Sequence, residues 1–362
     1  MPSPLSPLSF TRGPGLVNRM MLAPMTNTQS HADGTLSAEE RHWLTMRARG
    51  GFGGVMTAAA FVAPEGKGFT GQLGVHDDRC IEPLRLLTDA VRKEGRPSYI
   101  QLHHAGMRAT QSETGLPAIA PSAVADWKAR EMTVAEIEGA IEAYVRGAER
   151  AEQAGFDGVE IHGAHTYLIA EFLSAEYNRR EDEWGGSLDN RAGFLRAIID
   201  GVRARCGRDF TVGLRLSGER MGMRMGEVLS LCGELCAEDK LDFLELSLWD
   251  AFKDPEEDEF KGRPLFQWFA DLERHDTRLG VAGRIRSGAN IRTLLDAGID
   301  FALIGYAGIL NHDFPRRLGA DPEFRMPPLP TTPAHLAEEG LSPAFISYLR
   351  TDFQGFMDQI LD

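Results

Sequence analysis

The chain has 362 residues, 43% of them hydrophobic, which is enough to bury a large core in two domains or in one barrel-type domain. Its 39 basic and 53 acidic residues give a net charge of −14, and no lysine- or arginine-rich block occurs. This charge balance argues against nucleic acid and anionic membranes as partners, and it favours a small molecule.

Short β-rich segments closed by loops alternate with helical segments along most of the chain. Eight strands are predicted, at residues 19–23, 54–59, 98–102, 158–162, 211–217, 242–246, 279–282 and 301–304. Helices are predicted between them at residues 81–94, 133–154, 191–204, 225–239 and 291–297. Three of these helices are followed by a glycine, Gly95, Gly155 or Gly298, which is typical of a left-handed C-cap.

Alternating strands and helices imply parallel strands with right-handed crossovers, and eight such units close into an α/β fold of the (β/α)₈ barrel type. A doubly wound open sheet is the competing architecture. The barrel is favoured because chemically active side chains follow many different predicted strands, whose C-terminal ends would surround one mouth. Long loops are predicted after the third, fourth and sixth strands, at residues 106–131, 172–190 and 249–264.

The predicted domain organisation is a barrel at residues 1–320 and a C-terminal extension at residues 321–362. The extension contains a proline-rich stretch, residues 327–333, followed by helical segments. We expect it to pack on the barrel or on a neighbouring subunit, and the second arrangement would make the protein a homo-oligomer.

The cysteines of the chain number four, and none of them lies in a disulfide framework or a zinc-site spacing. The first thirty residues lack a basic start followed by an apolar stretch. No apolar run reaches the roughly 20 residues that a bilayer-spanning helix needs. We therefore expect a cytoplasmic protein.

The segment at residues 157–167 ends an apolar run in His162, His165 and Tyr167. Two imidazoles three residues apart can hold an oxygen by paired hydrogen bonds, and a phenol beside them can supply a proton. This arrangement indicates carbonyl chemistry. The same spacing also suits metal ligands from one loop, and structural histidines are common, so both alternatives stay open at this point.

Further motifs occur in a fixed order at successive strand ends. They are NR at 18–19, APMT at 23–26, QL at 101–102, HAG at 104–106, IHGAHTYL at 161–168 with EFLS, NRR, DEWGGS and NR continuing it to residue 191, and Arg215. On these motifs the chain resembles the Old Yellow Enzyme family of FMN-dependent oxidoreductases, from about residue 16 to about residue 315.

The resemblance implies an FMN cofactor and NADH or NADPH as the reductant. The Thr26 hydroxyl would lie near flavin O4, Gln101 would bond the pyrimidine side, and Arg215 would stabilise the negative charge of the reduced flavin. The implied cofactor-binding residues are Ala23, Pro24, Met25, Thr26, Ala59, Gln101, Arg215, Gly283, Arg284, Gly305 and Tyr306.

The chain departs from the family pattern after the eighth predicted strand. Gly305-Tyr306 stands where the family commonly has Gly-Arg, so the usual phosphate-binding arginine is absent from that position. Arg284 or Arg286 in the preceding loop could replace it, since a guanidinium pairs well with phosphate, and the hypothesis is that Arg284 does so. Thr28 and Met107 also differ from some members, which predicts a more apolar pocket on that side.

The resemblance implies reduction of the activated C=C bond of an α,β-unsaturated carbonyl or nitro compound. His162 and His165 would bind the substrate oxygen, Tyr167 would protonate the α-carbon, and Thr28 would line the pocket. A phenol suits that step because it stays protonated at neutral pH. The alternatives are another flavin oxidoreductase, acting on nitro or amine compounds or in a biosynthetic dehydrogenation, and a metal-dependent barrel hydrolase that uses His162 and His165.

Overall fold

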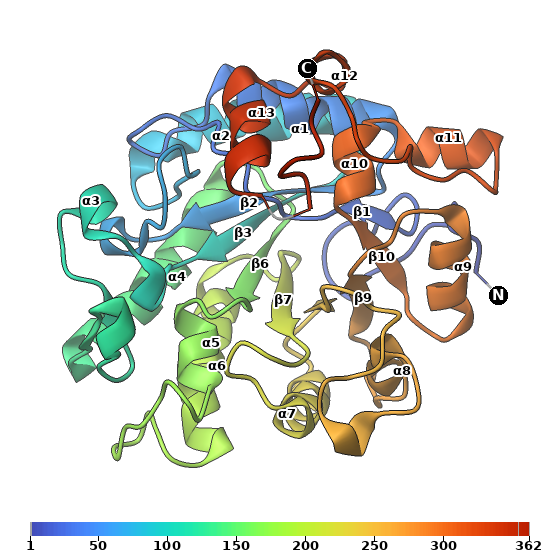
Figure 1. Ribbon diagram of the computed structural model, residues 1–362. Coiled ribbons are helices and arrows are strands. Elements are labelled where there is room, and N and C mark those ends of the chain that lie inside the picture. The colour runs from blue at the N-terminus through green and yellow to red at the C-terminus, as the bar shows by residue number, and fades with distance from the viewer. Residues whose placement is uncertain (1, 354, 362) are drawn as a thin grey trace.

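The computed structural model describes residues 2–353 and 355–361. Eight parallel strands close into one barrel, in the order β1-β10-β9-β8-β7-β6-β3-β2, with helices around the outside (Figure 1). The strands are β1 (Met20–Leu22), β2 (Gly54–Phe61), β3 (Ser98–His103), β6 (Gly158–Gly163), β7 (Thr211–Ser217), β8 (Phe243–Ser247), β9 (Arg278–Ala282) and β10 (Phe301–Ile304). The predicted barrel is confirmed, and each predicted strand agrees with an observed one to within two residues at either end.

The main helices pack against this barrel in chain order. They are α1 (Ala38–Gly50), α2 (Ile81–Lys93), α4 (Val134–Gln153), α5 (Leu168–Leu173), α6 (Leu188–Arg205), α7 (Met225–Ala237), α8 (Leu265–Ala270), α9 (Gly288–Asp296), α10 (Tyr306–Leu310) and α11 (Phe314–Ala320). Gly95, Gly155 and Gly298 have φ of 68°, 87° and 96°, as the predicted left-handed C-caps require.

Several helices differ from the sequence prediction: α1, α5, α8, α10 and α11 were not among the predicted helices, and α6 and α9 each begin three residues before the predicted start. Helix α1 was not predicted, because its sequence is mostly polar and its buried face mixes the charged Glu40 and Arg47 with apolar residues. Helix α6 begins at Leu188, three residues before the predicted start at Arg191, since the Ser187 side chain accepts the Asn190 N–H and caps the helix there.

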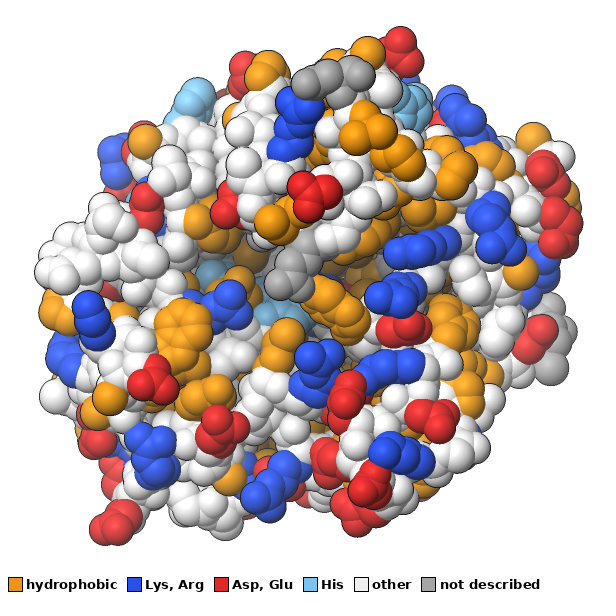
Figure 2. Space-filling view, in the orientation of Figure 1, with side chains coloured by type: hydrophobic (Ala, Val, Ile, Leu, Met, Phe, Trp, Pro, Cys, Tyr) orange, Lys and Arg blue, Asp and Glu red, His pale blue; other side chains and the backbone are white. Residues whose placement is uncertain are grey.

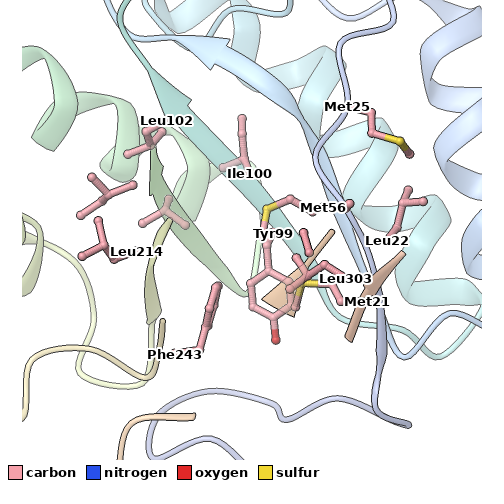
Figure 3. Close-up of a cluster of buried hydrophobic side chains, with 14 of the residues drawn as sticks. Met21, Leu22, Met25, Met56, Tyr99, Ile100, Leu102, Leu214, Phe243 and Leu303 are labelled. Carbon is pink, nitrogen blue, oxygen red and sulfur yellow. The ribbon is translucent and has the colours of Figure 1, made fainter. Parts of the chain in front are cut away.

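Aromatic rings close the end of the barrel at which the strands begin. Phe10, from the N-terminal segment, stacks on Phe243 with ring centroids 5.4 Å apart and meets Phe301 edge-on at 6.2 Å. Tyr99 lies against the same group, as Figure 3 shows beside Phe243. Because this end is filled, a ligand site can form only at the opposite end, where the strands finish.

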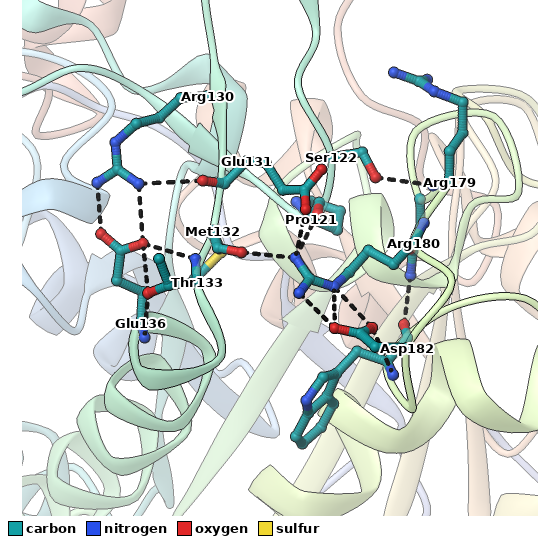
Figure 4. A network of polar contacts seen from close by, with 12 residues as sticks. Pro121, Ser122, Arg130, Glu131, Met132, Thr133, Glu136, Arg179, Arg180 and Asp182 are labelled. Atoms are coloured by element: carbon teal, nitrogen blue, oxygen red, sulfur yellow. Dashed lines mark hydrogen bonds and ion pairs between the residues drawn. The ribbon is translucent and has the colours of Figure 1, made fainter.

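The loop that follows β3 carries a second, two-stranded sheet made by β4 (Ile119–Ala120) and β5 (Arg130–Glu131). Arg180, from the loop after β6, donates to the carbonyl oxygens of Pro121 and Met132 and pairs with Asp182 (Figure 4). The two loops are thereby fixed to each other. The loop predicted at residues 172–190 is shorter than expected, because residues 172–173 belong to α5 and residues 188–190 to α6.

The C-terminal extension forms α12 (Pro333–Glu338) and α13 (Pro343–Thr351). Phe345 packs edge-on against Trp43 of α1 at 5.4 Å, and Arg47 donates a hydrogen bond of 2.7 Å to the carbonyl oxygen of Glu339. Both contacts place the extension on the barrel side that carries α1 (Figure 1). Over the described ranges, no helix combines the length and the apolar character that a bilayer crossing needs.

Candidate active site

The side chains of His162, His165 and Tyr167 come together at the end of β6. The ring centroids lie 5.1 Å apart for His162 and His165, 5.1 Å for His162 and Tyr167, and 6.4 Å for His165 and Tyr167. Figure 2 shows histidine side chains in a hollow near the middle of this face. The three residues that were singled out in the sequence therefore lie together at the C-terminal end of the barrel strands.

Backbone geometry after β6 brings the three rings together. His165 and Thr166 both have positive φ, 60° and 58°, which turns the chain back so that Tyr167 caps α5. A β-branched threonine rarely adopts this conformation, and such residues cost about 1–3 kcal/mol each. Arg108 and Ser217 hold the turn, since the guanidinium donates to the carbonyl oxygen of His165 at 2.9 Å and the Ser217 hydroxyl accepts the His165 N–H at 3.0 Å.

Both histidines are held neutral. Burial lowers the pKa of His162 and His165 well below the ordinary value, and the positive charges of Arg215 and Arg108 add to this effect. A neutral imidazole carries one N–H, so it can donate one hydrogen bond to a substrate oxygen without carrying a charge. The pair can thus polarise a carbonyl or nitro group as hydrogen-bond donors.

Tyr167 lies between an imidazole and a guanidinium. Its ring meets His103 of β3 edge-on at 4.2 Å, and the Arg108 guanidinium carbon lies 5.1 Å from the ring centroid. Arg108 directly follows Met107, a position at which the chain differs from some family members. Met107 itself is buried in a small cluster with Ala118, Ala120 and Ala129.

Arg215 lies within a chain of polar side chains that crosses neighbouring strands. Its Nε is 2.8 Å from Glu245 Oε1, and its Nη2 donates to Ser247 Oγ at 3.1 Å. Gln101 donates to Glu160 Oε1 at 2.7 Å. Burial, and then the neighbouring Glu245, raise the pKa of Glu160 well above its usual range, so Glu160 remains protonated.

The other predicted residues lie in β2 or directly after β1, β9 and β10. Ala23, Pro24 and Met25 are buried directly after β1, and Thr26 and Thr28 are partly exposed beyond them. Ala59 of β2 pairs in register with Gln101 of β3. Gly283 and Arg284 follow β9, and Gly305 and Tyr306 follow β10. All of these residues therefore lie at the barrel end that carries the histidine pair.

Tyr348 of α13 is a site residue that the sequence did not indicate. It hydrogen-bonds the Thr26 side chain, and burial raises its pKa to about 12. Phe353, directly beyond α13, packs on both Tyr348 and Tyr306, with centroids 5.8 Å and 5.4 Å apart. Only the tertiary fold could reveal this, because about 180 residues separate Tyr348 from the histidine motif. The extension therefore contributes to the barrel mouth.

The chain matches the NADH:flavin oxidoreductase / NADH oxidase family over residues 5–320. It belongs to this family. The probable NADH-dependent flavin oxidoreductase YqiG of Bacillus subtilis is 34% identical to it over 310 residues, which cover 83% of each chain. The match to three other curated relatives covers 36%, 31% and 32% of their length, so the chain spans about a third of each of these proteins.

Solved structures agree with this family assignment. Morphinone reductase in complex with tetrahydroNAD has a TM-score of 0.80 and 26% identity, and the match covers 100% of this chain and 98% of that one. The Old Yellow Enzyme homologue from Zymomonas mobilis has a TM-score of 0.77 and 27% identity, with 90% and 94% covered. The chain is a flavin-dependent NAD(P)H oxidoreductase of the Old Yellow Enzyme family, and its cofactor is FMN.

The residues at the mouth fit FMN. The Arg286 guanidinium lies 5.9 Å from the Tyr306 ring centroid, and its Nε is buried without a hydrogen-bond partner among the residues that the structure describes. A Cβ at Gly305 would meet only the Met25 sulfur, at 3.5 Å, so space for a ligand exists beside that backbone. Arg284 instead is more than half exposed and pairs with Asp250 at 3.2 Å. A guanidinium that forms no ion pair within the described part of the chain, near an open glycine, is suited to a phosphate.

Within residues 2–353 and 355–361, no group of three or more histidine, cysteine, aspartate or glutamate side chains is arranged to hold a metal ion. The membership in a flavin oxidoreductase family argues against the alternative of a metal-dependent hydrolase.

Proposed function

We propose that this enzyme reduces the activated C=C bond of α,β-unsaturated carbonyl or nitro compounds. The observation that carries the proposal is the convergence of two neutral imidazoles and one phenol within 6.4 Å of one another at the barrel mouth. When bound, FMN supplies the hydride, which it receives from NADH or NADPH. The residues of the chain then have to hold the substrate, polarise it and deliver a proton.

His162 and His165 donate hydrogen bonds to the carbonyl or nitro oxygen. These bonds draw electron density from the alkene and stabilise the negative charge that develops on that oxygen as hydride reaches the β-carbon. Tyr167 donates its phenolic proton to the α-carbon. The Arg108 guanidinium lies over the Tyr167 ring and helps to hold the phenol beside the histidine pair.

We propose further that Ala23, Pro24, Met25, Thr26, Ala59 and Gln101 contact the flavin ring system, and that Arg215 stabilises the reduced state. For the phosphate, the proposed ligands are the backbone N–H groups of Gly283, Arg284 and Gly305 together with one arginine side chain. The sequence suggested Arg284. The geometry favours Arg286, because Arg284 is engaged by Asp250 whereas Arg286 has a buried, unpaired Nε.

The proton-transfer step is tested with Tyr167→Phe in the FMN-loaded enzyme. General acid catalysis is worth about 10²–10⁴-fold, so reoxidation of the reduced flavin by 2-cyclohexenone should slow by that factor. Flavin reduction by NADH or NADPH should change by less than about threefold, since it needs no proton from Tyr167. Stopped-flow absorbance of the flavin separates the two half-reactions.

His275→Asn is a matched control in the same assay, because His275 is exposed and lies away from the mouth. Equal loss of both half-reactions in Tyr167→Phe would contradict the role of Tyr167. Normal flavin reduction with no oxidation by any enone, maleimide or nitroalkene in the wild-type enzyme would contradict the proposed substrate class.

A further inference from the structure

Ser217 and Ser247 end the adjacent strands β7 and β8, where they pair in register. Both reach His165, but at different atoms. The Ser217 hydroxyl accepts the backbone N–H of His165 at 3.0 Å, whereas Ser247 Oγ lies 2.8 Å from the ring nitrogen Nε2. One serine therefore holds the backbone of His165, and the other one contacts its imidazole.

The other neighbour of Ser247 leaves the hydroxyl proton free for the second hydrogen bond. Arg215 Nη2 lies 3.1 Å from Ser247 Oγ, and a guanidinium can only donate, so Ser247 accepts this bond. The hydroxyl proton is then available for His165 Nε2. If Ser247 donates it, Nε2 is the unprotonated nitrogen of His165 and the ring proton resides on Nδ1.

His162 shows the complementary arrangement. Its Nδ1 lies 3.2 Å from the backbone N–H of Ala164, which can only donate, so Nδ1 is the acceptor and the ring proton resides on Nε2. With Ser247 as donor, each imidazole uses one nitrogen as an acceptor toward the protein. The other nitrogen of each ring is left as an N–H donor for a ligand.

We propose that Ser247 is a positioning residue that fixes His165 in the Nδ1–H tautomer, so that both histidines donate to one substrate oxygen. The binding of a substrate oxygen by both histidines rests on the proposed function, because two donors are useful only to a ligand that carries such an oxygen. In the opposite tautomer the Nδ1 lone pair of His165 would face the oxygen lone pairs. The ring would then repel the group that it has to bind.

Glu245, which lies on β8 with Ser247, holds Arg215 in place beside the serine. Its carboxylate lies 2.8 Å from Arg215 Nε and so holds the guanidinium that directs Ser247. Glu245 and Ser247 are two residues apart on β8, so both side chains extend from the same face of the strand. From the sequence alone, Ser247 can be predicted only to be a polar residue at the end of a strand.

The tautomer can be measured directly by ¹⁵N NMR of the FMN-loaded enzyme labelled at histidine, with His165→Asn used to assign the resonances. Protonated and unprotonated ring nitrogens have well-separated shifts, so the proton on Nδ1 is visible without turnover. Wild type and Ser247→Thr should show Nδ1–H, because both have a hydroxyl. Ser247→Ala and Ser247→Val should lose this preference.

Ser217→Ala is the matched control, because it removes the hydroxyl that accepts the backbone N–H of the same histidine. The tautomer of His165 should be unchanged in this variant. Binding of cyclohexanone, an unreactive ketone, should weaken about tenfold in Ser247→Val and be largely retained in Ser247→Thr. An unchanged Nδ1–H tautomer in Ser247→Val, or an equal shift in Ser217→Ala, would overturn the inference. If the tautomer behaves as expected but enones are not reduced, the proposed function fails and the role of Ser247 stands.

Discussion

Buried neutral histidines make the stability of this barrel sensitive to acid. His104 lies at the end of β3 and is 1% exposed; its Nδ1 accepts the Gly106 N–H at 3.1 Å. Burial lowers the pKa of His104 from 6.5 to about 4. The folded state therefore excludes a proton that the unfolded chain binds, so this contribution to stability is present above pH 6.5 and is lost as the pH falls toward about 4.

The size of the loss follows from the same two values. Between pH 7 and pH 5, a histidine with a pKa of 6.5 when unfolded and about 4 when folded should lower the unfolding free energy by about 2 kcal/mol. His104→Asn keeps an acceptor for the Gly106 N–H but cannot titrate. The variant should therefore lose about 2 kcal/mol less than wild type over this interval.

The assay is urea unfolding at pH 5, 6 and 7 with a fixed excess of free FMN, because cofactor binding adds to the measured stability. His275→Asn serves as a control, since it makes the same substitution at an exposed position. It should follow the wild-type pH dependence. If His104→Asn also follows the wild-type curve, the reasoning from burial is refuted.

Three further predictions concern the packing and the cofactor. Arg47 is fully buried and donates to four backbone carbonyl oxygens, so Arg47→Ala should cost about 3–5 kcal/mol in urea unfolding, against less than about 0.5 kcal/mol for exposed Arg49→Ala. In fluorescence titrations of the apoprotein with FMN, Arg286→Ala should weaken binding about 10–100-fold and Arg284→Ala by less than about threefold; the reverse order would restore Arg284 as the phosphate ligand. A Cβ at Gly213 would overlap the Phe243 ring inside the barrel, so Gly213→Ala should lower the unfolding free energy by about 1–3 kcal/mol, and an unchanged urea midpoint would contradict this packing.

The sequence alone indicated the barrel, because eight short β-rich segments alternate with helical segments and chemically active side chains follow many of the strands. It also determined His162, His165 and Tyr167 as a group, since they lie within six residues at one strand end. It missed α1, because the buried face of that helix mixes apolar with charged side chains, and Glu40 is held there by hydrogen bonds from Asn27 and Ser30.

Only the tertiary structure decided which distant side chains complete the site. Ser247 reaches His165 because closing the barrel sets the register of β7 and β8, and sequence patterns do not encode the distance between two strand ends. Tyr348 reaches Thr26 because α13 packs on α1 through Phe345. Such contacts depend on long-range packing, in which each partner looks like an ordinary polar residue until the chain is folded.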